Sequence, residues 1–153
     1  MKQALVCMLC FLFLGLPLSA NFNRLEEVSS APAVASSFNG EYFNSEVGLH
    51  IFLDLDKESI EVPTMEFLGP MQGYMQGGIY GVWMLIKYEL KGEKLLLRFS
   101  NDIGSDSQTI ELSPLGENKY RYRAVGENLV RKAVGRRLVK IVDTMIMTKV
   151  EKK

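Results

Sequence analysis

Strict alternation of apolar and polar side chains recurs along the chain and limits the fold more than any other feature. In residues 47–55, VGLHIFLDL, five apolar side chains share one face of an extended chain and His50 lies on the other face. In residues 119–125, KYRYRAV, aromatic residues and alanine alternate with lysine and arginine. A period of two residues is typical of a β-strand with one buried face. Both segments are therefore predicted to be half-buried strands.

Segments rich in turn-forming residues separate the strand-like segments at regular spacing. These turns are expected at residues 56–59, 91–93, 101–107, 113–118 and 126–128. The further expected strands are residues 59–63, 79–90, 94–99, 108–112, 129–134, 137–142 and 144–150. Short, regular loops favour an all-β fold, an antiparallel up-and-down β-barrel of about eight to ten strands. A sandwich is the alternative, but closure into a barrel removes exposed strand edges.

Residues 128–142, NLVRKAVGRRLVKIV, come nearest to a helix, because several apolar residues recur at helical spacing. Gly135 interrupts the middle of this segment, and β-branched residues are frequent in it. Both features disfavour a helix relative to strands. We therefore expect two strands here instead of one helix.

The first twenty residues have the three parts of a secretory signal peptide. Lys2 supplies a positive charge, the apolar run ALVCMLCFLFLGLPL follows, and LSA at residues 18–20 ends in small residues. This pattern predicts cleavage after Ala20 and export to the periplasm or the extracellular space. Both cysteines, Cys7 and Cys10, would be removed, so the mature chain would hold no disulfide and no thiolate ligand.

The next segment, residues 21–37, is rich in Ser and Ala, contains Pro32 and shows no sustained periodicity. This composition predicts a flexible leader between the signal peptide and the folded part. The β-barrel domain is expected over residues 38–153.

Charge is unevenly distributed along the chain. Residues 21–118 carry fifteen acidic and six basic side chains, a net charge of −9, whereas residues 119–153 carry three acidic and eleven basic, a net charge of +8. A basic segment of this size would suit nucleic acid or anionic lipid. The alternative is that the two parts neutralise each other when a late strand pairs with an early one. We favour neutralisation and expect no nucleic-acid partner, because an exported protein rarely meets nucleic acid.

Few side chains in the sequence are suited to catalysis. His50 is the single histidine, and no nucleophile motif of the GxSxG kind accompanies it. Asp54 and Asp56 lie in an acidic turn that lacks the glycine of a calcium-binding loop. The glycines of residues 69–81 match no phosphate-binding motif. We therefore expect no catalytic residue, no metal site and no cofactor, and a protein that is not an enzyme.

A glycine-rich stretch, residues 69–83, GPMQGYMQGGIYGVW, ends in the only tryptophan of the chain. We interpret it as a glycine-hinged loop that leads into a strand apolar on both faces. Pliable methionine and amphipathic tyrosine suit the mouth of an apolar pocket. The predicted ligand-binding residues are Met71, Tyr74, Met75, Tyr80 and Trp83. The alternative is that these residues plug the end of the barrel and complete its core.

Two short segments, FNGEYF at residues 38–43 and DTMIMTKVEKK at residues 143–153, carry a family resemblance. They resemble the first and last strands of the calycin group, the lipocalin and fatty-acid-binding barrels. The resemblance implies a lipocalin-like closed barrel in which Lys149 packs near the first strand. The chain departs from that pattern, because Tyr42 replaces a tryptophan, no helical lid follows, and the Arg-x-Tyr that holds a fatty-acid carboxylate is absent. The resemblance therefore supports the topology more than any ligand.

Two functional hypotheses follow from these patterns. The first is a non-enzymatic carrier or sensor of a small hydrophobic or amphiphilic ligand, whose anionic head group would meet Arg121 or Arg123 if their face points inward. The second is an interaction module with a filled core that docks a protein or cell-envelope partner. Charges in the late strands argue against a membrane-spanning protein. An empty or a filled interior distinguishes the two hypotheses.

Overall fold

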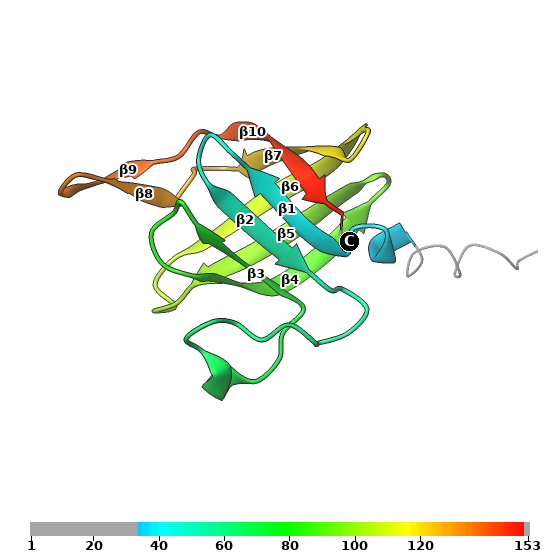
Figure 1. The fold of residues 1–153 in the computed structure, drawn as a ribbon, viewed down its shortest axis with the longest axis horizontal. Helices are drawn as coiled ribbons and strands as arrows, with labels where there is room; N and C mark the ends of the chain where they lie inside the picture. The colour runs from blue at the N-terminus through cyan, green and yellow to red at the C-terminus, as the bar shows by residue number, and fades with distance from the viewer. Residues whose placement is uncertain (1–33, 152–153) are drawn as a thin grey trace, which may run out of the picture.

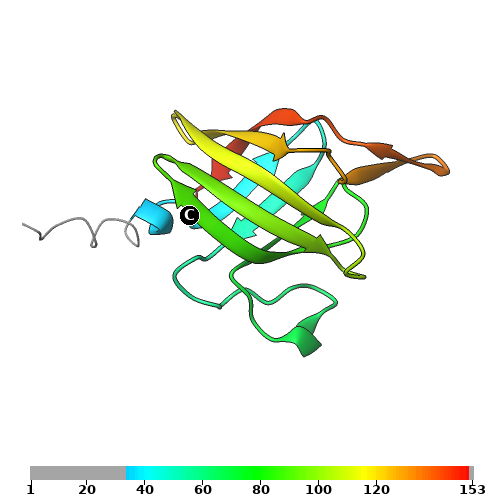
Figure 2. The same cartoon turned by 180° about the vertical axis from the view of Figure 1, so that it is seen from behind.

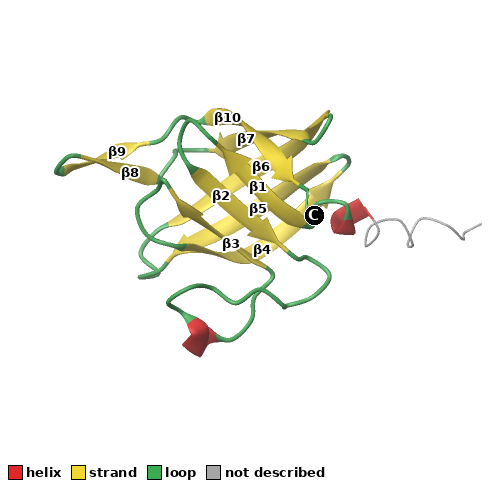
Figure 3. Ribbon diagram, in the orientation of Figure 1, coloured by secondary structure: helices red, strands yellow, loops and turns green. Residues whose placement is uncertain are grey.

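Eight antiparallel strands close into a barrel in the computed structural model, which describes residues 34–151 (Figure 1). The wall consists of β1 (Gly40–Asn44), β2 (Leu49–Leu53), β3 (Gly73–Gly77), β4 (Trp83–Lys91), β5 (Lys94–Asn101), β6 (Ser107–Gly116), β7 (Lys119–Val125) and β10 (Thr144–Val150). Within the described residues, helix is confined to one turn at residues 34–36 and to η1 (Glu66–Leu68) (Figure 3). The predicted all-β, up-and-down barrel is confirmed. The predicted signal peptide, residues 1–20, and residues 21–33 of the leader lie outside the described residues.

Most barrel strands pair with their neighbours in the chain, and the first and last strands complete the circle. β1 pairs with β2 over five residues and with β10 over three, where Tyr42 lies opposite Lys149. β10 pairs on its other side with β7. Every strand of this wall therefore has two partners, which removes the exposed edges that favour aggregation.

A separate two-stranded hairpin, formed by β8 (Arg131–Val134) and β9 (Arg137–Lys140), lies between β7 and β10 in the chain. The prediction of two strands over one helix is thus confirmed for this segment. These strands are not part of the wall, and Figure 1 and Figure 2 show the hairpin extending away from the barrel. Gly135, with a φ of 60°, supplies the backbone conformation that its two-residue turn requires.

One predicted strand is wrong. Residues 59–63 contribute only an isolated bridge, between Ile60 and Met71. Val62 in the same segment is fully buried. The segment therefore belongs to a long loop that folds against other side chains instead of pairing along its length.

The turn predicted at residues 113–118 is also wrong in extent. β6 continues through Pro114 to Gly116, and the register shifts between these two residues. Proline is tolerated in a strand at such a bulge, so its presence did not mark the end of the strand. The turn itself consists of Glu117 and Asn118, which both have positive φ.

The glycine-rich stretch, residues 69–83, contains the wall strand β3 instead of a hinged loop, which corrects the prediction for it. Glycine is needed here because the backbone of this stretch lies very close to the backbone of its neighbours. A Cβ on Gly73 would lie 2.5 Å from the carbonyl oxygen of Phe52, and one on Gly78 would lie 1.6 Å from that of Val47. Any larger residue would push β3 and the following turn away from the neighbouring backbone.

Side chains fill the interior of the barrel. One contiguous cluster of buried apolar residues runs through it. Its largest fully buried members are Tyr42, Leu49, Ile51, Met75, Leu95, Leu97, Phe99, Ile110, Leu112, Tyr122 and Met147. The inward faces of β2 and β7 are those that the alternation predicts. An interior of eight strands is just wide enough for side chains to fill, and here they do so.

The core extends upstream of β1. Ala35, in the helical turn before β1, and Phe38 are 6% and 3% exposed and belong to the core cluster. The Asn39 side chain accepts a hydrogen bond from the backbone N–H of Leu55 at 2.7 Å and donates one to Asp56 at 2.7 Å. These contacts fix the start of the described chain against the end of β2.

Two buried tyrosines differ in hydrogen bonding, which predicts opposite effects of removing each hydroxyl. The Tyr42 hydroxyl donates to the carbonyl oxygen of Phe38 at 2.7 Å. The buried Tyr122 hydroxyl has no hydrogen-bond partner within residues 34–151. Tyr42→Phe is expected to lower the free energy of unfolding by about 1 kcal/mol and Tyr122→Phe to raise it by about 1 kcal/mol. Urea unfolding measures both, and a destabilised Tyr122→Phe variant would contradict this account of the core.

Candidate functional site

Of the residues predicted to line a binding mouth, Met75 and Trp83 lie opposite each other across β3 and β4, and Trp83 Nε1 donates to the carbonyl oxygen of Tyr80. Met75 and Trp83 lie in the core, at 0% and 3% exposure. Tyr74 is outside the core cluster and stacks on Phe52, with 4.7 Å between ring centroids. Burial raises the pKa of the Tyr74 hydroxyl. Met75 and Tyr74 therefore contribute to opposite faces of β3.

The other two members of that predicted mouth lie at opposite ends of β3. Met71, before β3, exchanges backbone hydrogen bonds with Ile60 at 2.9 and 3.0 Å. Tyr80, after β3, is 62% exposed, and its backbone N–H donates to the carbonyl oxygen of Arg131 at 2.6 Å. None of the five lines the groove at the other end of the barrel described below.

Arg121 and Arg123 are exposed on the outer face of β7, so the condition for their meeting a head group inside the barrel is not met. Arg123 donates to Glu111 of β6 at 2.8 Å, and Lys94 of β5 donates to the same carboxylate at 3.2 Å. The hydrogen bond from Arg123, reinforced by Lys94, holds the pKa of Glu111 below its usual value. Here a late strand does neutralise an early one.

His50 lies on the outer wall among structural partners. Its Nδ1 is 2.7 Å from Oε1 of Glu41, and its ring lies 4.4 Å from the Phe43 ring and 6.0 Å from the Phe52 ring, centroid to centroid. Within residues 34–151, no three His, Cys, Asp or Glu side chains are grouped closely enough to hold a metal ion. The geometry around His50 is that of an aromatic row on the wall.

Positive charge is concentrated on the hairpin β8–β9, an element that the barrel does not need. Residues 131–140, RKAVGRRLVK, contain five Lys or Arg and no acidic residue. β7 and β10 are adjacent in the wall, and a two-residue turn such as Glu117–Asn118 is enough to join adjacent strands. The connection over residues 126–143 is far longer, so the hairpin is an addition to the fold.

The cations of the hairpin are mostly not neutralised. Within the described chain, only Lys140 of the five forms an ion pair, with Glu127. The hydrogen bond from Lys140, with a smaller effect of Arg131, lowers the pKa of Glu127. Arg131 and Lys140 lie directly opposite each other in the ladder, and like charges so placed are destabilising. The charge therefore does not serve the stability of the hairpin.

Apolar side chains are exposed on and beside the same hairpin. They are Val134 (53%), Leu138 (45%), Val139 (45%) and Val142 (54%). Lys132 lies opposite Val139, and Val134 lies opposite Arg137. Each of these two cross-strand pairs therefore combines one apolar and one cationic side chain.

Buried polar side chains fix the base of the hairpin. Asn128, 3% exposed, donates to the carbonyl oxygen of Ile141 at 3.1 Å and accepts from the N–H of Val130 at 3.1 Å. Gln108 of β6, 1% exposed, accepts from the N–H of Leu129 at 2.8 Å. Val130 and Ile141 both belong to the core cluster. The hairpin therefore leaves the barrel from a packed and hydrogen-bonded base.

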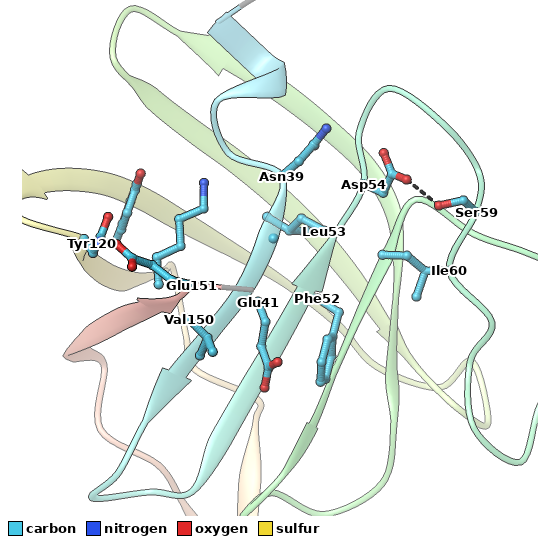
Figure 4. A pocket seen from close by; sticks show the side chains of 13 residues that line it. Asn39, Glu41, Phe52, Leu53, Asp54, Ser59, Ile60, Tyr120, Val150 and Glu151 are labelled. Atoms are coloured by element: carbon cyan, nitrogen blue, oxygen red, sulfur yellow. Dashed lines mark hydrogen bonds between the residues drawn. The ribbon is translucent and has the colours of Figure 1, made fainter. Parts of the chain in front are cut away.

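An open groove of about 960 Å³ lies at the opposite end of the barrel, where β2 ends and β7 begins. Phe52, Leu53 and Ile60 supply apolar surface there (Figure 4). Asp54 lies beside them and accepts a hydrogen bond from Ser59. The groove thus offers an apolar strip beside polar groups.

Lys149 lines this groove and joins the last strand to the first. Its Nζ donates to the carbonyl oxygen of Ser37 at 2.7 Å and lies 5.7 Å from the centroid of the Tyr42 ring. Burial lowers the pKa of this lysine. A Cβ on Gly40 would lie 3.0 Å from its side chain, so Gly40 leaves the space that Lys149 occupies.

Comparisons with known proteins do not supply a function. No known protein family, curated protein or solved structure matches this chain. The resemblance to the calycin group remains a prediction based on two terminal segments. Residues 34–151 contain no helix long and apolar enough to cross a membrane.

The strands of the hairpin are predictable from the sequence, but its role is not. The charge excess after residue 119 is visible, and the prediction assigns it to neutralisation. That assignment describes Arg123 with Glu111, whereas Lys140 pairs with Glu127 of the same basic part of the chain. It does not describe the rest of the hairpin, where pairs of cations and pairs of apolar residues follow one another around Gly135 and no acid intervenes. This local composition is the signal that could have identified the hairpin.

Asn128→Ala is expected to loosen the hairpin without changing its composition. The variant leaves the N–H of Val130 and the carbonyl of Ile141 without their side-chain partner, so the free energy of unfolding should fall by about 2 kcal/mol. Amide hydrogen exchange over residues 131–140 should become faster than in the wild type. As a control, Gln76→Ala on the outer face of β3 should change stability by less than about 0.5 kcal/mol. Unchanged exchange in the hairpin would contradict the anchoring role.

Proposed function

We propose that this protein is an exported, non-enzymatic interaction module that docks on an anionic partner through the hairpin β8–β9. The supporting observation is a projecting element with five cations, of which only Lys140 is ion-paired within the described chain. Positive charge displayed in this way attracts an anionic surface and speeds association with it. The signal-peptide pattern supports an encounter outside the cytoplasm.

The packed interior favours a docking module over a carrier. A carrier needs a pocket of roughly 300–1,000 Å³ for a small ligand. Met75, Phe99 and Tyr122 are 0% exposed and occupy the interior where such a ligand would lie. A ligand there would have to displace the core, which supports the second of the two functional hypotheses.

Charge reversal on the hairpin tests the proposal. The variant combines Arg131→Glu, Lys132→Glu, Arg136→Glu and Arg137→Glu. Each cation near an anionic surface contributes about 1 kcal/mol, so the variant should bind roughly a thousandfold more weakly. The mature chain, residues 21–153, should be retained at low salt on a column that carries a sulfated polysaccharide, and the variant should wash through.

A second variant with the same net charge is the control. It combines Lys57→Glu, Lys87→Glu, Lys91→Glu and Lys119→Glu, all at exposed positions outside the hairpin. This variant should elute close to the wild type. If it elutes as early as the hairpin variant, net charge rather than the hairpin governs retention and the proposal is wrong.

The groove supports a second candidate function, the binding of a small amphiphile. Its volume of about 960 Å³ falls within the range of known ligand pockets, and Lys149 lies beside its apolar surface. Trp83 lies at the hairpin end of the barrel, where its Nε1 donates to the carbonyl oxygen of Tyr80. Its fluorescence therefore cannot report on the groove at the other end. A fluorophore must therefore be introduced.

Phe52→Trp places such a fluorophore in the groove. Titration with a long-chain fatty acid and with a bile acid should give a saturable fluorescence shift at micromolar ligand. Ile146→Trp, on the exposed outer face of β10, is the matched control and should not respond. A flat response from a folded Phe52→Trp variant would remove the groove as a site for these amphiphiles.

A further inference from the structure

We propose that the anionic partner is the surface of a lipid bilayer, and that the tip of the hairpin enters its headgroup region. This inference rests on the proposed function, because it takes the hairpin as the docking element and names what the hairpin docks on. The observation behind it is that apolar side chains are exposed among the cations of the hairpin. Attraction to an anionic polymer would not explain these apolar side chains.

Cross-strand pairs place the two kinds of side chain at defined levels of the hairpin. Arg131 lies opposite Lys140 next to the barrel. Toward the tip follow the pairs Lys132–Val139, Ala133–Leu138 and Val134–Arg137. Neighbouring pairs lie on alternating faces of a ladder. The base is therefore cationic, the outer pairs carry apolar side chains on both faces, and Arg136 and Arg137 add two cations at the tip.

This arrangement fits a bilayer better than the other anionic partners. Nucleic acid or an acidic polysaccharide would neutralise the cations but leave Val134, Leu138 and Val139 in water. An apolar groove on a protein would bury those residues only by burying cations as well, which is unfavourable without anionic partners. At a bilayer surface, apolar side chains reach the acyl boundary while Lys and Arg extend to the phosphates. Both kinds of side chain are satisfied on both faces.

The length of the hairpin suits this depth. Each of its strands has four residues, and at roughly 3.3 Å per residue they span about 13 Å. The polar region of one leaflet is about 5–8 Å thick. The apolar side chains near the tip therefore reach the acyl boundary, while Arg136 and Arg137 extend back to the phosphates and the barrel wall stays in water.

Two further exposed side chains lie beside the base of the hairpin. Tyr80 is 62% exposed, and its backbone N–H is bonded to Arg131. Val142, 54% exposed, lies in the linker from β9 to β10. Tyrosine favours the interface between membrane and water. With the tip at the acyl boundary, both residues lie just outside the headgroups, at the end of the barrel that faces the bilayer.

Sedimentation with vesicles tests the inference by separating apolar contact from charge. The mature chain should sediment with vesicles of phosphatidylcholine mixed with phosphatidylglycerol, and not with phosphatidylcholine alone. Val134→Thr, Leu138→Thr and Val139→Thr together keep every cation, and threonine keeps the strand propensity. This triple variant should bind the anionic vesicles about tenfold more weakly or worse, with its retention on the polysaccharide column unchanged.

A matched triple variant at exposed apolar positions outside the hairpin is the control. It combines Phe67→Thr, Leu68→Thr and Leu115→Thr, whose side chains are 82%, 45% and 45% exposed. This variant should bind anionic vesicles like the wild type. An equal loss of binding in both triple variants would show general hydrophobic adsorption and overturn the inference.

A single labelled cysteine reports on insertion directly. The mature chain holds no cysteine of its own, so an environment-sensitive fluorophore on Val134→Cys is unique. Its emission should shift to shorter wavelength with anionic vesicles. The same fluorophore on Ile146→Cys, on the outer wall, should not shift. No shift at position 134, from a protein that sediments with the vesicles, would mean adsorption by charge without insertion and would contradict the inference.

The two proposals fail in different ways. Retention of the wild type on the polysaccharide column without sedimentation on anionic vesicles would overturn the bilayer inference and leave the anionic partner a polymer. If the wild type is neither retained on the column nor sedimented with anionic vesicles, the proposed function itself is overturned. A hairpin charge-reversal variant that elutes like the wild type would overturn it as well. Wild-type vesicle binding by the Val134, Leu138 and Val139 variant would also overturn the bilayer inference, which those side chains carry, and would leave the proposed function standing.

Discussion

Pairing between β1 and β10 joins the two ends of the described chain, and the rest of the structure depends on it. Three residue pairs form this seam, with Tyr42 opposite Lys149. The Asn44 side chain adds a hydrogen bond to the carbonyl oxygen of Ile146 at 2.8 Å. Without the seam, β1 and β10 would each expose an edge, and the inward faces would no longer enclose one core. Closure therefore satisfies the backbone and fixes which side chains are buried.

Closure also makes the hairpin an addition. Because β7 and β10 are neighbours in the wall, any short turn could join them, and residues between them are free to serve another purpose. Loops at the ends of a rigid scaffold commonly carry function for this reason. Asn128 and Gln108 show that the hairpin is held in place, since a buried polar side chain is unfavourable unless its hydrogen bonds are made. The partners of both amides include backbone groups at the base of the hairpin.

Sequence patterns predict much of this fold, and the failures have physical causes. Period-two alternation identifies β2 and β7 with their inward faces. Residues 69–83 were misassigned because glycine permits both a flexible loop and a close approach of backbones, and only the neighbouring strand decides which. Pro114 was misassigned because a bulge accommodates it inside β6. The adjacency of β7 and β10 skips two strands, so no local pattern reveals that the hairpin projects.

A chain of zero formal net charge can still be drawn to an anionic surface, because charge acts locally. Screening limits interactions between exposed charges to about 8 Å at physiological salt, which is shorter than the roughly 13 Å reach of the hairpin. In the wall, acids and bases meet across strands, as Glu111 does with Arg123. The hairpin leaves the wall, so the acids of the barrel do not cancel its charge at the tip. The electrostatic attraction of an approaching anionic surface therefore depends on the cations of the hairpin more than on the zero net charge of the whole chain.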